Sequence, residues 1–301
     1  MAETDAPIGF VGLGAMGLHM TARLIQAGYT VIAWDISPTA LAVAGGIGVI
    51  PADGPGDLAR RCATVITALP GIDAVRAVAL GVPGDEGLID GWEPGAVLVD
   101  MGSASPDGTV ELGRTLTASG IGYIDAPVSG GIARALTGEL AVMAGGDAAL
   151  VERMRPLLGV LGRQVIHTGP LGSGQAMKAL NNLVSAGGLM IALEALTVGR
   201  RFGLDPATMV DVLNISTGRN YATEAKIKPF VLSRSFASGF SLNLMVKDLD
   251  TAADVARNLG IDLPLSHTVV ELAHRAAEAL GTGADHTAVA RYLDAVAGSS
   301  Q

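Results

Sequence analysis

A polar stripe interrupts an otherwise apolar segment in the second half of the chain. The segment GQAMKALNNLVSAGGLMIALEAL, residues 174–196, consists mainly of Ala, Leu, Met, Val and Ile. Its polar members Lys178, Asn181, Asn182 and Ser185 are spaced at i, i+3, i+4 and i+7, which places them on one face of a helix. An amine and two amides on one face could hold a polar substrate and move a proton. The helix pattern alone equally permits a lysine whose stem packs on apolar neighbours while its ammonium reaches water.

A glycine-rich motif near the start of the chain is the second chemical signal. In IGFVGLGAMG, Gly12, Gly14 and Gly17 follow the order G-x-G-x-x-G between a strand-like run and a helix-like run. Such glycines permit a tight turn, the approach of backbone amides to a pyrophosphate, and close packing of the helix on the strand. The motif predicts a dinucleotide site formed by the loop residues Gly12, Leu13, Gly14, Ala15 and Met16.

The acid at the end of the next strand-like run bears on which dinucleotide is used. Asp35 lies where a dinucleotide-binding unit has a carboxylate for the ribose hydroxyls, and this charge would repel a 2′-phosphate. Residues 36–40 contain no basic side chain that could bind such a phosphate. We therefore expect NAD rather than NADP, the alternative being that Asp35 is an ordinary solvated acid. A flavin could use the same glycines, but the further segments of a flavoprotein are not recognisable.

The order of the sequence patterns predicts two domains. Strand-like runs at residues 8–14, 29–35, 64–70, 96–102, 121–128, 140–146 and 164–169 alternate with helical patterns, which is typical of a parallel sheet with crossover helices. Helical patterns alone follow: one opening near residue 172, then 206–213, 242–259, 264–280 and 287–296. We predict an α/β protein with a Rossmann-type dinucleotide-binding domain at residues 1–168. An all-helical domain at residues 169–301 should begin with a long interdomain helix.

Composition limits the classes of partner. The 301 residues are 49% hydrophobic and 16% charged, enough for a large core, and the net charge of −9 argues against nucleic acid or an anionic membrane as the main partner. The single cysteine, Cys62, permits no internal disulfide, which favours a reducing compartment. No secretory signal is recognisable, and the longest apolar run, residues 183–193, is too short to cross a bilayer. We expect a cytoplasmic protein that binds no membrane.

The histidines give no indication of a metal site. His19, His167, His267, His274 and His286 show no metal-ligand spacing and no recognisable pairing with a carboxylate. We expect them to be surface or packing residues and predict no bound metal.

Six ordered motifs run along the chain: GFVGLGAMG (9–17), TALP (67–70), VDMGSASP (99–106), DAPVSGG (125–131), GSGQAMKALNN (172–182) and LMVKDL (244–249). Together they resemble the motifs of the β-hydroxyacid dehydrogenase family, which includes 3-hydroxyisobutyrate dehydrogenase and tartronate semialdehyde reductase. The resemblance covers nearly the whole chain and implies hydride transfer between NAD and a small β-hydroxyacid or the corresponding semialdehyde. A sensor or scaffold that binds a dinucleotide without catalysis is the alternative.

The resemblance gives the polar stripe a role. Lys178 matches the family's general acid/base, and desolvation on an apolar helix lowers the pKa of a lysine towards the working pH. Asn182, one turn further on, matches the asparagine that holds the substrate beside that amine. Asn181 points about 100° away from its neighbour, so only one of the two need face the substrate.

The other motifs supply binding residues by the same resemblance. The substrate carboxylate would be bound through a hydroxyl and backbone amides by Ser129, Gly130 and Gly131. The cofactor would be contacted by Leu69, Pro70 and Ser103. Lys247 would lie near the nicotinamide, with Asp248 beside the substrate pocket and Phe240 in the apolar wall of that pocket. Gly102 stands where the family usually has a serine. Without the resemblance, DAPVSGG is a glycine turn after a strand, and the charged pair in LMVKDL is a solvated helix face.

The segment GRNYATEAKIKPF, residues 218–230, is the best candidate for substrate selectivity. Arg219 could hold a second polar or anionic group by a bidentate contact, so we expect a substrate with a polar or charged substituent beyond its carboxylate. A surface ion pair with Glu224 is the alternative. The long apolar helix with Gly187 and Gly188 also predicts close packing against another helix, in a homodimer or homotetramer.

Overall fold

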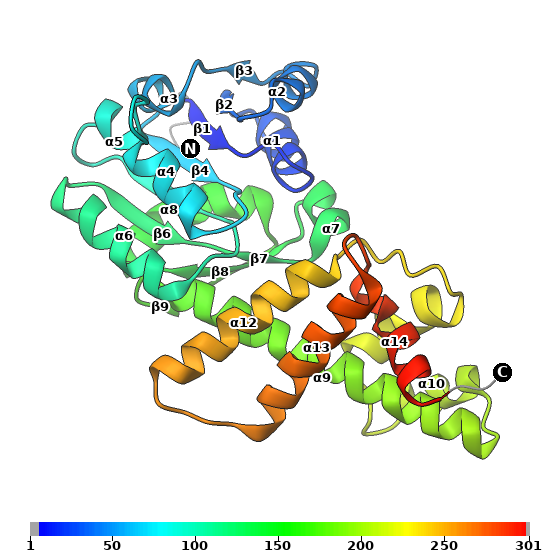
Figure 1. Ribbon diagram of the computed structural model, residues 1–301. Helices are drawn as coiled ribbons and strands as arrows, with labels where there is room; N and C mark the ends of the chain where they lie inside the picture. The colour runs from blue at the N-terminus through cyan, green and yellow to red at the C-terminus, as the bar shows by residue number, and fades with distance from the viewer. Residues whose placement is uncertain (1–5, 299–301) are drawn as a thin grey trace. The chain divides into compact units, whose positions relative to one another are not determined.

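The computed structural model describes residues 6–298, which form two compact units (Figure 1). The first unit ends at Lys178 and the second begins at Ala179, so the division falls inside helix α9 (Ser173–Phe202). The boundary drawn from sequence, at residues 168 and 169, lies ahead of this helix at the end of the last strand. Each unit is described by itself below.

A nine-stranded sheet forms the centre of the first unit. The strands are β1 (Ile8–Val11), β2 (Val31–Trp34), β3 (Ile50–Pro51), β4 (Thr64–Thr67), β5 (Val97–Asp100), β6 (Gly122–Asp125), β7 (Val128–Ser129), β8 (Ala141–Gly145) and β9 (Gln164–Gly169). They are arranged in the order β3-β2-β1-β4-β5-β6-β8-β7, with β9 also paired to β8. All seven predicted strands are confirmed. Strands β3 and β7 were not predicted, because two residues are too few to show a hydrophobic pattern.

The sheet is parallel from β3 to β6, as predicted, but not at the other edge. Strand β8 runs antiparallel to both β6 and β7, and only β9 restores a parallel pairing with β8. The expectation of a parallel sheet throughout is therefore wrong here. Antiparallel neighbours need no long crossover, so the short connection containing helix α7 (Gly131–Thr137) is sufficient.

Helices cover both faces of this sheet. They are α1 (Gly17–Gln26), α2 (Pro38–Gly45), α3 (Pro55–Arg61), α4 (Ile72–Leu80), α5 (Leu88–Gly91), α6 (Pro106–Ala118), α7 and α8 (Ala148–Leu161). The adjacent β1 residues Phe10 and Val11 belong to two different apolar clusters, because successive side chains of a strand point to opposite faces. Cys62 is buried in the second cluster, and burial raises the pKa of its thiol to about 11, which is expected of a structural cysteine.

The second unit is helical. After α9 come α10 (Pro206–Ile215), α11 (Tyr221–Ala225), the π-helix η1 (Ile227–Leu232), α12 (Leu242–Asn258), α13 (Pro264–Leu280), the 3₁₀ turn η2 (His286–Ala288) and α14 (Val289–Val296). The five predicted helices are confirmed. Helices α11 and η1 were not predicted, since residues 218–230 were interpreted as a connection. The core of this unit is built on Leu189, Leu193, Met245, Leu249 and Ala273.

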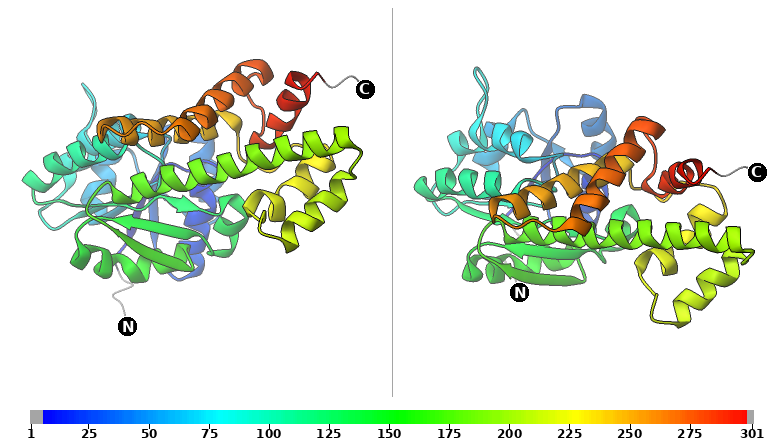
Figure 2. Two further views of the ribbon diagram at one scale, coloured as in Figure 1. Left: turned by 90° about the horizontal axis from the view of Figure 1, so that it is seen from below. Right: turned by 60° about the horizontal axis from the view of Figure 1, so that its bottom comes forward.

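Helix α9 is one uninterrupted helix of 30 residues (Figure 2). By length and composition it could cross a bilayer, contrary to the expectation drawn from residues 183–193 alone. The apolar core helix of a soluble protein meets the same criteria, and Ala186, Leu189, Met190 and Leu193 are buried in the core of the second unit. The helix is therefore no more than weak evidence of a membrane span.

Candidate active site

The three motif glycines after β1 are each needed for a different reason. Gly12 has φ +95°, and a Cβ there would lie 2.5 Å from the Ala68 carbonyl oxygen. A Cβ at Gly17 would lie 1.8 Å from the Gly12 carbonyl oxygen, so α1 could not begin so close to the turn. A Cβ at Gly14 would meet nothing within 4 Å. Packing within the protein therefore does not require glycine at this position, whereas the approach of a pyrophosphate to the backbone would.

Asp35 organises this loop as well as offering an acceptor. Its Oδ2 accepts a hydrogen bond from the Leu13 N–H at 2.6 Å, and its Oδ1 accepts one from the Ser37 N–H at 2.7 Å. Asp35 is half-buried, so it is not an ordinary solvated acid. Each carboxylate oxygen keeps a second acceptor position, which leaves capacity for ribose hydroxyls. The next residue, Ile36, is 88% exposed and offers an apolar surface beside it.

The predicted cofactor residues Leu69, Pro70 and Ser103 lie in the loops that follow β4 and β5. Strand β1 has β4 on one side and β2 on the other, so the strand order reverses between β1 and β4. Open α/β sheets bind ligands at such a point, beyond the carboxyl ends of the strands. A Cβ at Gly102 would lie 2.4 Å from the Leu69 carbonyl oxygen, and this close approach explains the glycine where the family usually has a serine.

A buried polar network, missed in the sequence, fixes the start of α9. The Asp125 carboxylate accepts hydrogen bonds from the Gly172 and Gln175 N–H groups, both at 2.8 Å. Gln175 Oε1 accepts from the Ala104 N–H at 2.9 Å, and its Nε2 donates to the Gly102 carbonyl at 3.0 Å. The first turn of α9, three residues before Lys178, is thus attached to the segments that follow β5 and β6. The acid that ends the β6 run was the available signal, but its partners lie 47 and 50 residues away.

Burial raises the pKa of Asp125 to about 6. Desolvation is the largest cause, and the hydrogen bonds from Gly172 and Gln175 oppose it by stabilising the ionised form. This carboxyl group therefore titrates within the range in which the protein is handled, although it serves the scaffold of the site.

Lys178 and Asn182 lie one turn apart on α9, and both are half-buried. Within the second unit, Asn182 Nδ2 donates to Asp248 Oδ2 at 2.5 Å, and Asn182 Oδ1 accepts from Asn181 Nδ2 at 3.1 Å. The two asparagines therefore form one hydrogen-bonded pair that Asp248 orients.

Asp248 is a positioning residue in this arrangement. It is 3% exposed, and its Oδ1 lies 3.9 Å from Lys247 Nζ. The pair Lys247–Asp248 is thus not the solvated helix face that was the alternative from sequence. The direct substrate and cofactor contacts assigned to these two residues by resemblance stay predictions.

The DAPVSGG segment ends in a turn that requires its two glycines. Ser129 ends β7, and the following residues Gly130 and Gly131 have φ values of +135° and +66°, which disfavour any residue with a Cβ. All three are half-buried or exposed. Their binding of a substrate carboxylate stays a prediction.

Phe240, the predicted pocket wall, packs edge-on against His286 with ring centroids 5.4 Å apart. Burial is the main cause that lowers the pKa of His286, whose Nδ1 lies 3.6 Å from Asp285 Oδ1.

Two other histidines also pair with carboxylates: His267 with Asp262, and His274 with Asp250. The expectation that no histidine pairs with a carboxylate is therefore wrong; the packing of α12 against α13 brings together residues 24 positions apart. Among residues 6–298, no group of three or more His, Cys, Asp or Glu side chains could hold a metal ion.

Arg219 forms the surface ion pair that was the alternative to substrate binding. Its Nε lies 3.5 Å from Glu224 Oε1, and the two side chains are 64% and 50% exposed. No observation within residues 6–298 connects it with the substrate-binding residues.

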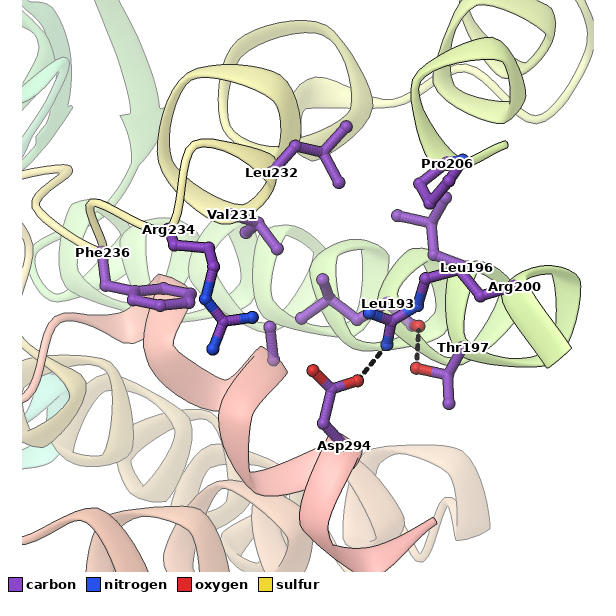
Figure 3. A pocket seen from close by; sticks show the side chains of 11 residues that line it. Leu193, Leu196, Thr197, Arg200, Pro206, Val231, Leu232, Arg234, Phe236 and Asp294 are labelled. Atoms are coloured by element: carbon purple, nitrogen blue, oxygen red, sulfur yellow. Dashed lines mark hydrogen bonds and ion pairs between the residues drawn. The ribbon is translucent and has the colours of Figure 1, made fainter. Parts of the chain in front are cut away.

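A cavity of about 210 Å³ in the second unit lies apart from the predicted site residues (Figure 3). Its walls come from α9, α10, η1 and α14, and an ion pair between Arg200 and Asp294 crosses one side. None of the residues assigned to substrate or cofactor lines it.

Known proteins resemble this chain in sequence over most of its length. Residues 7–169 match the NAD binding domain of 6-phosphogluconate dehydrogenase, and residues 172–293 match the family described as NAD-binding of NADP-dependent 3-hydroxyisobutyrate dehydrogenase. The chain is 36% identical to 2-(hydroxymethyl)glutarate dehydrogenase of Eubacterium barkeri, over 99% of this chain and 98% of that protein. It is 34% identical to human mitochondrial 3-hydroxyisobutyrate dehydrogenase, over 84% and 76% of the two chains.

A solved structure matches over almost the full length. The 3-hydroxyisobutyrate dehydrogenase of Mycobacterium tuberculosis, in complex with L-serine, has a TM-score of 0.89 at 32% identity and covers 96% of this chain and 99% of its own. These relatives are catalysts, which favours an enzyme over a sensor that only binds a dinucleotide. The protein belongs to the β-hydroxyacid dehydrogenase family of NAD(P)-binding oxidoreductases that act on a CH–OH group.

Proposed function

We propose that the protein is an NAD-dependent dehydrogenase that oxidises a small β-hydroxyacid, or reduces the matching semialdehyde, with Lys178 as general acid/base. The observation that carries this proposal is the placement of Lys178 and Asn182 one turn apart on α9, with the Asn182 amide oriented by buried Asp248. A bound nicotinamide supplies the hydride acceptor or donor. Lys178 Nζ takes the hydroxyl proton in oxidation and returns it in reduction, while Asn182 holds the substrate beside that amine.

The substrate carboxylate is bound, in this proposal, by Ser129 and the backbone amides of Gly130 and Gly131. An acidic protein must capture an anion locally, and the positive φ values of the two glycines support a turn suited to this. Lys247 contributes a positive charge near the nicotinamide.

Lys178→Met tests the general acid/base. Turnover, followed at the absorbance band of the reduced nicotinamide with a panel of hydroxyacids, should fall by about two to four orders of magnitude. NAD affinity, measured by fluorescence titration, should stay unchanged. Ser185→Ala is the control, because Ser185 is exposed on the same stripe of the same helix. Wild-type turnover in Lys178→Met contradicts the assignment, and NAD binding without turnover on any acid of the panel supports the sensor.

The preference for NAD is supported by the Asp35 carboxylate and the lack of a basic side chain at residues 36–40. Ile36→Arg keeps both Asp35 hydrogen bonds and, with Ile36 exposed, needs no repacking. Asp35→Asn removes the carboxylate charge and keeps only one of these two hydrogen bonds, which affects the binding of both cofactors. The double variant should raise the ratio of NADP to NAD efficiency by about tenfold or more, because a change of about 1.4 kcal/mol in charge interaction corresponds to a tenfold ratio. Steady-state kinetics with both cofactors measure this ratio. A wild-type enzyme that already prefers NADP contradicts the proposal.

We also propose a cytoplasmic homodimer or homotetramer. The exposed apolar residues Val184, Ile191 and Val198 follow one another at seven-residue spacing on α9, and they are 75%, 62% and 69% exposed. A second copy of the chain would cover this stripe, as the seams of paired helices do. Light scattering on the purified protein measures the assembly, and a monomeric mass contradicts it.

A further inference from the structure

Lys226 is a half-buried lysine that forms no ion pair. It lies in the second unit, between α11 and the π-helix η1, within the segment predicted to govern selectivity. Its Nζ lies 5.8 Å from the ring centroid of Tyr221 and 5.4 Å from that of Phe230. None of the ion pairs among residues 6–298 includes Lys226. The ammonium is therefore held between two aromatic rings without a carboxylate beside it.

The other basic residues of the same segment are paired. Arg219 lies beside Glu224, and Lys228 Nζ lies 2.5 Å from Asp211 Oδ1. Lys226 differs from both in its burial and in its lack of a partner. A desolvated charge is costly unless an anion compensates it, so the position is suited to an anionic ligand.

The acidic group that acts on Lys226 through its charge is already occupied by other hydrogen-bond donors. Asp285 acts on Lys226 through its charge and opposes the lowering of the lysine's pKa by burial. Its carboxylate, however, already accepts hydrogen bonds from the Ser238 hydroxyl, the Gly239 N–H and the Thr287 N–H. These bonds tie Asp285, which precedes η2, to the loop before α12 and leave the ammonium without a dedicated acceptor.

The surroundings of Lys226 connect with the elements that carry the substrate residues of this unit. The charge of Lys226 lowers the pKa of His286, whose ring packs on Phe240, the predicted pocket wall. Phe240 lies just before α12, the helix of Lys247 and Asp248. Asn220 Nδ2, at the start of α11, donates to the Gly188 carbonyl on α9 at 3.2 Å, six residues beyond Asn182. The segment of Lys226 is thus hydrogen-bonded to α9, and Val231 of the adjoining η1 packs against the apolar cluster that contains Met245 and Leu249 of α12.

We propose that Lys226 is a specificity-determining residue that binds a second carboxylate of the substrate, distant from the reacting hydroxyl, so that the substrate is a hydroxy-dicarboxylic acid. This inference rests on the proposed function. The ammonium donates charge-assisted hydrogen bonds to the distal carboxylate, and Tyr221 and Phe230 pack against the methylene groups between the two acids. The relative that is 36% identical over 99% of this chain is named for a substrate of this chemical class.

Lys226→Met tests this role, because it removes the charge and keeps the length of the side chain. We expect kcat/KM for 2-(hydroxymethyl)glutarate to fall about 10- to 100-fold, mainly through KM, since the lost contact is a hydrogen bond between charged groups. The value for 3-hydroxyisobutyrate, which has one carboxylate, should change by less than about threefold. Lys228→Met, two residues further along the chain, is the matched control, and it should leave kcat/KM for both acids unchanged.

Several outcomes overturn the role of Lys226. The role is wrong if kcat/KM of Lys226→Met falls equally with 2-(hydroxymethyl)glutarate and 3-hydroxyisobutyrate, or if kcat/KM for 2-(hydroxymethyl)glutarate is unchanged. It is also wrong if the wild-type enzyme prefers 3-hydroxyisobutyrate. Glutarate, which has two carboxylates and no hydroxyl, gives a readout that does not depend on turnover. Calorimetry should show binding that weakens about tenfold or more in Lys226→Met, and equal glutarate binding in the two proteins overturns the inference. The proposed function fails separately, if NAD binds and no hydroxyacid is oxidised.

Discussion

Replacing Asp248 tests whether a buried carboxylate orients the amide that holds the substrate. Asp248 is 3% exposed, accepts from Asn182 Nδ2 at 2.5 Å and lies 3.9 Å from Lys247 Nζ. In Asp248→Ala, the Asn182 amide loses its acceptor and is free to rotate away from the position beside Lys178. In Asp248→Asn, the new amide oxygen can still accept from Asn182, so the orientation is kept while the charge is lost.

The size of the effect follows from the hydrogen bond that is lost. A hydrogen bond to a charged group contributes about 1.5–3 kcal/mol. Since about 1.4 kcal/mol corresponds to a tenfold change in rate, kcat/KM of Asp248→Ala should fall about 10- to 150-fold. Asp248→Asn should lose less, because it gives up only the charge-assisted part of the interaction.

The assay is steady-state oxidation followed at the reduced-nicotinamide band, with thermal unfolding measured on each variant. Asp250→Ala is the matched control, since Asp250 lies two residues further along α12 and pairs with His274 at the surface. A folded Asp248→Ala enzyme within about threefold of wild type would refute the reasoning. So would an equal loss in Asp250→Ala, because that residue has no contact with Asn182.

Two further predictions concern the first unit. Gly17→Ala should lower the free energy of unfolding by about 1–3 kcal/mol or more, because the new Cβ would overlap the Gly12 carbonyl oxygen. Gly14→Ala should have the same urea midpoint of unfolding as the wild type but should bind NAD more weakly. Urea unfolding and NAD titration measure the two effects, and unchanged NAD binding in Gly14→Ala argues against a pyrophosphate there. The second prediction uses Asp125, whose pKa rises from 3.8 to about 6 on folding, so its protonated form stabilises the fold below about pH 4 and this contribution is lost as the pH rises through 6. The shift corresponds to about 3 kcal/mol, so Asp125→Asn should gain stability relative to wild type between about pH 4 and 7, and a difference that does not vary with pH contradicts it.

Local patterns were sufficient for most of the elements. A buried strand needs a run of apolar residues and an amphipathic helix needs a period of 3.6, and both signals lie within a single segment. The same helical period places Lys178 and Asn182 on one face of α9 without reference to any tertiary contact. The glycine motif was equally readable, because the steric demands at Gly12 and Gly17 arise within a short strand, turn and helix.

The tertiary structure decided what depends on residues distant in the chain. Asn182 and Asp248 are 66 residues apart, and no periodicity in either helix indicates that they meet. The antiparallel β6–β8 pairing depends on how the chain turns around α7, and the raised pKa of Asp125 depends on its burial beneath the start of α9.

Residues 218–230 show both what local patterns predict and what only tertiary contacts decide. The sequence predicted that this segment governs selectivity and singled out Arg219, which the fold pairs with Glu224 at the surface. Only the packing of α11 and η1 distinguishes half-buried Lys226 from its paired neighbours. The sequence determines the type of each side chain, but the desolvation of that side chain and the charges around it depend on contacts that form when the chain folds.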